Sequence, residues 1–397
     1  MFPIQAAFRS VRHRIHLPTI SLTIFPATPA SIPPAYRRNF HLEGLALAPV
    51  VFGGLFVSLW TWKCFMMVVF QNKIIYMPGL PPNSRWEKID DYKERFGGIL
   101  WREERVRAAD GTDLALCVTD LDVGSNRDPY SPEFTFYVLY FQGNASSIPP
   151  RLPDLSSILG MLRRQIATEH RSVRYTMVCL SYRGYWTSRG RPTENGLRLD
   201  AAAAINWISR MHQERNHEKP DNLNLPAELV LWGQSIGAGV ATNLAADHSM
   251  TGNLQLNSLI LETPFTSIRA MLEVLYPQKW LPYKYLWPFL RNHLDSWKNI
   301  GLIANRYHGE KLLPEVLIVQ AAKDELVPAE LSQKLYNRCV ELQLPVDRIA
   351  VNGAFHNDAM FRAEGRRAIS EFLARRMMEL KTNQRLPPNH RHEKLWR

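Results

Sequence analysis

The stretch "LVLWGQSIGAGVATNLAA", residues 229–246, decides the fold of this 397-residue chain. A short apolar segment runs into Gly233-Gln234-Ser235-Ile236-Gly237 and then into a helical pattern of small residues. Gly-x-Ser-x-Gly between a strand and a helix is typical of a sharp turn that exposes a serine hydroxyl. The alternative is a tight turn whose glycines have no chemical role. The remaining sequence has to decide between the two.

The pattern around this turn is that of an α/β domain. From about residue 96, short apolar runs alternate with longer helical patterns, which predicts a mainly parallel central sheet flanked by helices. The expected strands are 113–121, 134–141, 174–182, 228–232, 258–263, 315–322 and 347–351, and the expected helices are 155–166, 197–211, 236–246 and 364–377. Open parallel sheets place their chemistry at the carboxyl ends of the strands. Residue 235 falls at such an end.

A serine hydroxyl is a weak nucleophile at neutral pH and needs a base. In α/β-hydrolases the order along the chain is serine, acid, histidine. His356 stands in "NGAFHND", a loop between an expected strand and the last helix, and Asp324 directly follows the strand "VLIVQAA". Asp347 precedes a strand and Asp358 is too close to His356 in sequence, so neither is placed to orient the imidazole. We therefore predict an α/β-hydrolase fold with Ser235, Asp324 and His356 as catalytic residues and no metal or cofactor.

An acyl-transfer site also needs two backbone N–H groups that converge on the developing oxyanion. One is the N–H of Ile236, which follows the nucleophile. The strand "YVLYF" ends in Gln142-Gly143-Asn144, and we expect the N–H of Asn144 to be the second donor, with Gly143 allowing close approach. Gly233 and Gly237 are the expected glycines of the nucleophile turn.

One stretch breaks the alternation of strands and helices. Residues 271–297, "MLEVLYPQKWLPYKYLWPFLRNHLDSW", are rich in aromatic side chains and interrupted by Pro277, Pro282 and Pro288. Such an insertion between late strands predicts a small helical cap over about 266–300. Its aromatic side chains either line an apolar binding pocket or pack the cap onto the core. The sequence leaves both interpretations open.

An apolar segment precedes the α/β pattern. Residues 45–62 contain no charge, and Lys63 alone separates them from the apolar run 64–70. About 20 apolar residues cross the hydrocarbon core of a bilayer, so we predict an N-terminal transmembrane anchor within 41–70; a buried core helix is the alternative. Arg37 and Arg38 precede the segment, so the positive-inside rule keeps the N-terminus cytosolic and places the α/β domain across the membrane.

The net charge of +11 is concentrated at the two ends of the chain. Residues 1–40 carry five arginines and no acid, residues 381–397 carry five basic residues and one acid, and the remainder is close to neutral. A neutral folded part argues against a nucleic-acid partner. We expect a basic segment 1–40, the anchor 41–70, the α/β-hydrolase domain 71–377 and a basic tail 378–397. The membrane is that of the endoplasmic reticulum or another endomembrane; because residues 1–40 also fit a mitochondrial presequence, a mitochondrial membrane is the alternative.

Over about residues 71–375 the motifs resemble those of the Bem46-like α/β-hydrolases, the group that includes the α/β-hydrolase-domain proteins 12, 13 and 17. The matching segments are "NKIIYMPGLPPNSRW", "YFQGNA", "LSYRGYWTSRGRPTENGLRLDAAAAINWI", "WGQSIGAGVA", "AAKDELVP" and "FHNDA". Two positions depart from the family pattern. Gln142 replaces the histidine of the oxyanion loop, and Trp186 replaces a small residue after Tyr185.

The resemblance implies a membrane-anchored serine hydrolase that acts on lipid-like acyl esters or thioesters. Family members that are understood act on lysophospholipids or remove palmitate from proteins. The alternative is a catalytically silent membrane scaffold that retains the fold and serves polarity or trafficking partners.

Overall fold

A computed structural model describes residues 42–123, 134–166, 173–217, 227–247, 254–310 and 313–385. The expected segment 1–40 and the end of the expected basic tail lie outside the described residues. The chain divides into two compact units, the first ending at Ser58 and the second beginning at Leu59. The second unit contains the sheet and the three predicted catalytic residues.

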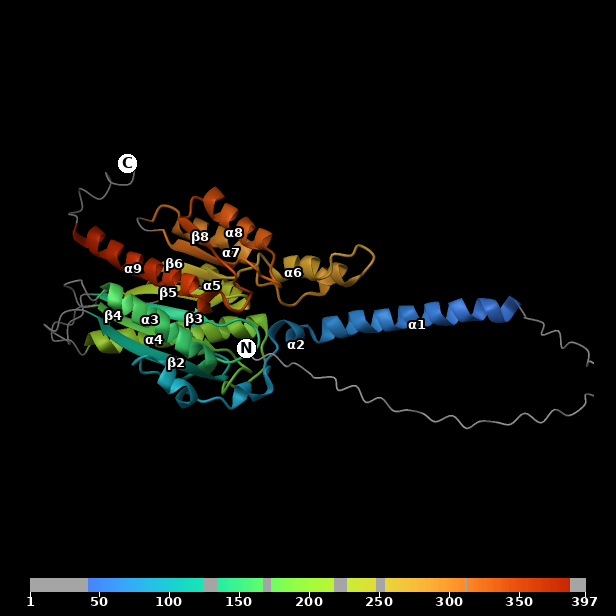
Figure 1. Cartoon of the computed structure of the whole chain (residues 1–397), viewed down its shortest axis with the longest axis horizontal. Helices are drawn as coiled ribbons and strands as arrows, with labels where there is room; N and C mark the ends of the chain where they lie inside the picture. The colour runs from blue at the N-terminus through green and yellow to red at the C-terminus, as the bar shows by residue number, and fades with distance from the viewer. Residues whose placement is uncertain are drawn as a thin grey trace, which may run out of the picture. The chain divides into compact units, whose positions relative to one another are not determined.

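An eight-stranded sheet forms the centre of the second unit, in the order β1-β2-β4-β3-β5-β6-β7-β8 (Figure 1). The β2 strand is antiparallel to both of its neighbours, and the strands from β4 to β8 are parallel. The strands are β1 (Arg102–Arg107), β2 (Asp113–Val123), β3 (Phe134–Phe141), β4 (Val173–Ser181), β5 (Ala227–Gln234), β6 (Leu254–Glu262), β7 (Glu315–Ala321) and β8 (Val346–Val351). This arrangement is that of an α/β-hydrolase, as predicted.

Helices cover both faces of the sheet. The helices are α1 (Leu42–Val69), α2 (Gln71–Tyr76), α3 (Leu152–Ile166), α4 (Glu194–His217), α5 (Ile236–Asp247), α6 (Ile268–Leu275), α7 (Ser296–Tyr307), α8 (Ala329–Glu341) and α9 (Ala363–Arg385). Short 3-10 helices are η1 (Pro82–Arg85), η2 (Ile89–Arg95), η3 (Pro149–Arg151), η4 (Tyr283–Phe289) and η5 (Ala359–Phe361). Helices α3 and α9 pack together on one face, and α4, α5, α7 and α8 form the layer on the other face.

The central strands are apolar on both sides because both faces are covered. In β5, Leu229 and Leu231 join the core under α4 and α5, whereas Val230 and Trp232 join the core under α3 and α9. All four side chains are buried. The continuous apolar run that indicated a strand in the sequence is thus explained by two cores that meet at one sheet.

Two features of the fold were not visible in the sequence pattern. The edge strand β1 reads "REERVR" and only Val106 is buried, so its residues lack the apolar alternation of a strand. It forms because its backbone pairs with β2 from Arg102 opposite Val118 to Arg107 opposite Asp113. The second feature is the end of the expected cap region. The region contains α6 and η4, but its last residues belong to α7, which packs against α5.

Helix α1 contains one segment, Leu47–Val69, that is long and apolar enough to cross a membrane. Its large apolar side chains are exposed, among them Leu47, Phe52, Phe56 and Trp62. A core helix would bury such side chains. The described structure is therefore consistent with a single membrane-spanning helix.

Candidate active site

The predicted nucleophile lies at a strained turn between β5 and α5. Ser235 has a φ of 53°, a left-handed value that is uncommon for a residue other than glycine. Its amide donates a hydrogen bond of 2.8 Å to the carbonyl of Glu262 at the end of β6. This bond ties the turn to the neighbouring strand and holds the serine at the carboxyl edge of the sheet.

The two flanking glycines permit the close packing of this turn. A Cβ atom on Gly233 would lie 2.1 Å from the carbonyl oxygen of Gly237, and one on Gly237 would lie 2.2 Å from the carbonyl oxygen of Phe141. Real Cβ atoms do not approach other atoms so closely, and both neighbours are backbone atoms that cannot rotate away. Gly233 lets the chain fold back on itself, and Gly237 lets α5 begin directly against the end of β3.

Three side chains that are far apart in sequence meet at this turn. His356 Nε2 lies 2.9 Å from Ser235 Oγ, and His356 Nδ1 lies 2.9 Å from Asp324 Oδ2. The His356 and Asp324 side chains are only 2% and 4% exposed. The structure thus brings together all three residues that were predicted from the sequence.

Backbone hydrogen bonds fix the acid of this group. Oδ1 of Asp324 accepts the amides of Leu326 at 3.0 Å and Val327 at 2.8 Å. An ionised carboxylate only accepts hydrogen bonds, so Nδ1 of His356 carries the proton and Nε2 is free to accept one from Ser235. The backbone amide of His356 donates to Oε2 of Glu325 at 3.0 Å, which holds the histidine loop in place.

The loop after β3 lies beside the nucleophile. A Cβ on Gly143 would lie 3.6 Å from the Cβ of Ser235 and 3.3 Å from Oε1 of Gln234, so the backbone of this loop lies close to the nucleophile turn. Within the described residues, the amides of Asn144 and Ile236 donate no hydrogen bond to the protein. These are the two N–H groups predicted for the oxyanion, and both remain available for a ligand.

The segment that supports this loop was not predicted from the sequence. The amide of Ala145 donates to the carbonyl of Tyr76 at 3.1 Å, and the hydroxyl of Tyr185 donates to the same carbonyl. The Tyr76 hydroxyl donates in turn to Oδ1 of Asn292 at 2.9 Å. Tyr76 is fully buried and lies just after the apolar helix. Its only signal in the sequence was its place in the segment "NKIIYMPG".

Asn292 and Glu194 connect the cap region to the helices below it. Oδ1 of Asn292 also accepts the amide of Glu194 at 2.9 Å, and Oε1 of Glu194 accepts the side-chain amide of Asn243 in α5 at 3.2 Å. Oε2 of Glu194 accepts the amides of His293 and Leu294. A buried carboxylate with several donors is well satisfied, so this group fixes residues 292–294 against α4 and α5.

A second buried carboxylate lies behind the catalytic group. Glu262 is 0% exposed, and its Oε1 accepts the amide of Met360 at 3.0 Å, four residues past His356. Burial raises the pKa of Glu262 to about 7, although the positive charge of Arg151 and the Met360 amide act in the opposite direction. Glu262 was not predicted as a site residue, because an acid at the end of a strand is compatible with many roles.

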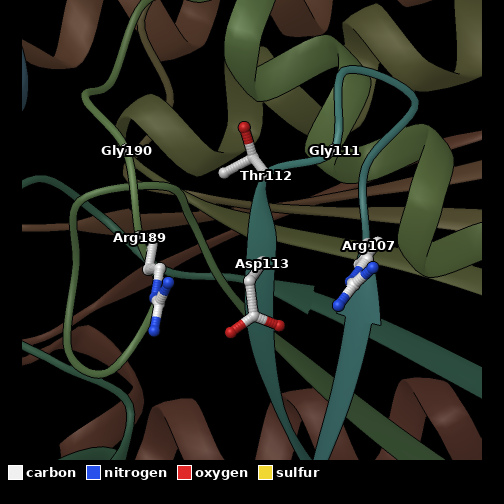
Figure 2. Close-up of a pocket in the computed structure, with 6 residues that line it drawn as sticks. All are labelled: Arg107, Gly111, Thr112, Asp113, Arg189 and Gly190. Atoms are coloured by element: carbon white, nitrogen blue, oxygen red, sulfur yellow. The ribbon is translucent and has the colours of Figure 1, made fainter.

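Two cavities lie on the surface away from Ser235. One, of about 330 Å³, lies between the β1–β2 turn and the loop that contains Gly190, and Figure 2 shows Asp113 between Arg107 and Arg189. A hydrogen bond from Arg105 is the largest of the effects that lower the pKa of Asp113. The other, of about 560 Å³, is lined by residues that include Trp86, Trp101 and Trp186. Within the described ranges, no group of three or more His, Cys, Asp or Glu side chains is placed to hold a metal ion.

The strand order, the turn at Ser235 and the hydrogen-bonded serine, histidine and aspartate together define the α/β-hydrolase class. No protein-family model matches the chain. Its relatives include an uncharacterised protein of Mycobacterium tuberculosis, 32% identical over 197 residues, which are 50% of this chain and 58% of that protein. They also include the lysophosphatidylserine lipase ABHD12 of Xenopus tropicalis, 30% identical over 226 residues, or 57% of this chain and 52% of the lipase.

The same lipase from Danio rerio is 33% identical over 201 residues, which are 50% of this chain and 46% of the lipase. These matches confirm the predicted resemblance to the α/β-hydrolase-domain proteins, here to domain protein 12. The chain spans about half the length of the curated relatives it matches. Among solved structures, an esterase of Pyrococcus furiosus is similar over 72% of this chain and 92% of its own, with 16% identity and a TM-score of 0.46.

Proposed function

We propose that this chain is a membrane-anchored serine hydrolase that cleaves acyl esters or thioesters of lipid-like substrates through an acyl-enzyme on Ser235. The observation that carries the proposal is the unbroken line of hydrogen bonds from Ser235 Oγ through His356 to Asp324 at the carboxyl edge of the sheet. A fold that needed only a tight turn here would not require a buried histidine and a buried acid in line with the serine.

In the first half of the reaction, Ser235 Oγ attacks the acyl carbon and its proton passes to Nε2 of His356. The carbonyl oxygen becomes an oxyanion, to which the amides of Asn144 and Ile236 donate. When the carbon–oxygen or carbon–sulfur bond breaks, the imidazolium returns its proton to the leaving alcohol or thiol. The acyl group is then bonded to Ser235.

In the second half, a water molecule gives a proton to His356 and attacks the acyl carbon. The bond to Ser235 breaks, the serine oxygen regains a proton from the imidazolium, and the carboxylic acid leaves. Asp324 stabilises the imidazolium in both halves and does not itself change protonation.

The substrate class follows from the relatives and from the apolar helix. Two of the relatives named above are lysophosphatidylserine lipases, which supports a lipid-like acyl substrate for this chain. The segment Leu47–Val69 would hold the enzyme in a membrane. The domain boundaries expected from the sequence, 41–70 for the anchor and 71–377 for the hydrolase, form part of this proposal. The endoplasmic reticulum or another endomembrane stays the expected location, with a mitochondrial membrane as the alternative.

A fluorophosphonate probe on the full-length protein in isolated membranes tests the proposal. The probe reacts with an activated serine, so we expect labelling of the wild type and none of Ser235→Ala. A folded wild type that is not labelled and hydrolyses no acyl ester would favour the catalytically silent scaffold instead. The anchor is tested separately by alkaline carbonate extraction, in which a spanning protein stays in the membrane pellet.

A further inference from the structure

The cap segment, defined here as Val274–Leu294, exposes large apolar side chains on its surface. Within 15 residues it presents Leu275, Trp280, Tyr285, Trp287 and Phe289, whose exposed fractions run from 43% for Trp287 to 68% for Trp280. A water-soluble surface carries single apolar residues, but a concentrated group of them marks an interaction site. The exposed apolar side chains of the cap segment therefore form a surface to which a partner can bind.

The charges of the cap segment are of one sign. It contains Lys279, Lys284 and Arg291 and no aspartate or glutamate. Tryptophan, tyrosine and lysine together are the residues enriched at the interface between membrane and water. Basic side chains near such an interface place their charge at the headgroup level. The composition of the cap segment thus matches a bilayer surface.

The cap segment is also bonded to the end of the apolar helix. The guanidinium of Arg291 donates to the carbonyls of Val68 and Val69, both at 3.1 Å, and these are the last residues of α1. The side chain of Gln71 donates to the carbonyl of Phe289 at 3.1 Å. The cap therefore contacts the chain where the apolar segment Leu47–Val69 ends.

A further contact lies one to two turns earlier in the helix. The ammonium group of Lys63 lies 4.6 Å from the ring centroid of Tyr283 in η4. Lysine near the end of a span places its charge at the headgroup level. The residues of α1 that meet the cap are thus those that would lie in the headgroup region if the helix spans a bilayer.

We propose that the cap segment is a second, peripheral membrane contact, in which Trp280, Tyr285, Trp287 and Phe289 enter the headgroup and upper acyl region of the bilayer that holds α1. The inference rests on the proposed function in so far as that function includes the anchor. It adds which surface of the hydrolase domain faces the lipid.

The test is a depth measurement by spin label on the full-length protein in nanodiscs of phosphatidylcholine and phosphatidylserine. Labels are placed singly by Trp280→Cys, Phe289→Cys and, as a control, Trp86→Cys. Trp86 is 79% exposed, and its neighbours in sequence carry both signs of charge, with Arg85 and Lys88 beside Glu87. A fourth label at Val57→Cys reports on α1. Spectra of the protein without an introduced cysteine supply the background from Cys64.

We expect the labels at 280, 289 and 57 to be accessible to oxygen and protected from a water-soluble nickel chelate, and the label at 86 to show the reverse. Labels at 280 and 289 that are as accessible to the chelate as the label at 86 overturn the inference and leave the anchor intact. Labels protected from both reagents indicate contact with protein, which also overturns it. Chelate access at residue 57 overturns the anchor and, with it, this inference.

Discussion

Gly143 and Ser235 lie so close together that a Cβ on residue 143 would be in van der Waals contact with the Cβ of the serine, at 3.6 Å. The contact joins the loop after β3 to the turn after β5, two strands that are neighbours in the sheet although about 90 residues separate them in sequence. It brings the free amide of Asn144 to the same edge as the free amide of Ile236. The role of these two amides in stabilising an oxyanion can be tested directly.

Asn144→Pro removes one of the two donors, because proline has no backbone N–H. We expect its turnover to fall by about 10²- to 10³-fold, the usual effect of losing one oxyanion donor. The matched variant Asn144→Ala keeps the amide and should retain turnover within a few-fold. The measurement is the hydrolysis rate of a short-chain acyl ester at saturation. Equal rates for the two variants would assign the oxyanion to other groups.

Asp324→Asn replaces the acid by a side chain that stabilises the imidazolium poorly and can favour the wrong tautomer of His356. We expect a loss of about 10⁴-fold in kcat without a loss of fold. Asp358→Asn is the control, because Asp358 accepts the amide of Phe355 and pairs with Arg362 instead of contacting the imidazole. A normal kcat in Asp324→Asn, measured with the same ester, would reassign the acid.

Gly237→Ala tests the packing of the nucleophile turn. Its Cβ would lie 2.2 Å from the carbonyl of Phe141, so either the start of α5 or the end of β3 must move. We expect a loss of stability of about 3 kcal/mol or more and loss of probe labelling.

Gly160→Ala in α3 is the control, because its Cβ meets only the flexible end of Arg164 at 3.9 Å. That change should stabilise the helix by up to about 1 kcal/mol. Thermal unfolding compares the two, and an unchanged melting temperature in Gly237→Ala would contradict the packing argument.

The central fold and the candidate catalytic group were predictable from the sequence because each depends on a short-range pattern. Strands covered on both faces appear as continuous apolar runs. Ser235 directly follows one such run and Asp324 lies three residues after another, whereas His356 lies five residues past the largely exposed strand β8. The parallel sheet then brings the ends of these runs to one edge. The spatial convergence is therefore a consequence of topology and needs no long-range contact to be known beforehand.

Other parts depend on contacts that no local pattern encodes. The charged strand β1 exists only because β2 offers a free edge. Tyr76 and Asn292 meet across 216 positions of sequence through one hydrogen bond between two polar atoms. Either residue alone would fit a surface loop equally well. Their pairing follows from the way the segment after α1 packs under the end of the cap segment.

The last prediction concerns the pH dependence of stability and rests on Glu262. Burial raises its folded pKa to about 7 from the ordinary glutamate value of 4.5, so the folded protein keeps a proton that the unfolded chain releases in this interval. The stability from this group is fully present below the unfolded pKa and is lost as the pH rises through the folded one. The difference between the two pKa values corresponds to about 3 kcal/mol of unfolding free energy.

Glu262→Gln cannot ionise. Between pH 5 and pH 8 the wild type should therefore lose more unfolding free energy than Glu262→Gln, by an amount of this order. Thermal unfolding of the full-length protein at the two pH values measures the effect. Glu371→Gln, a change at an exposed position of α9, should follow the wild type. Parallel behaviour of wild type and Glu262→Gln would mean that Glu262 is ionised in the folded protein throughout this range, with Arg151 and the Met360 amide outweighing the effect of burial.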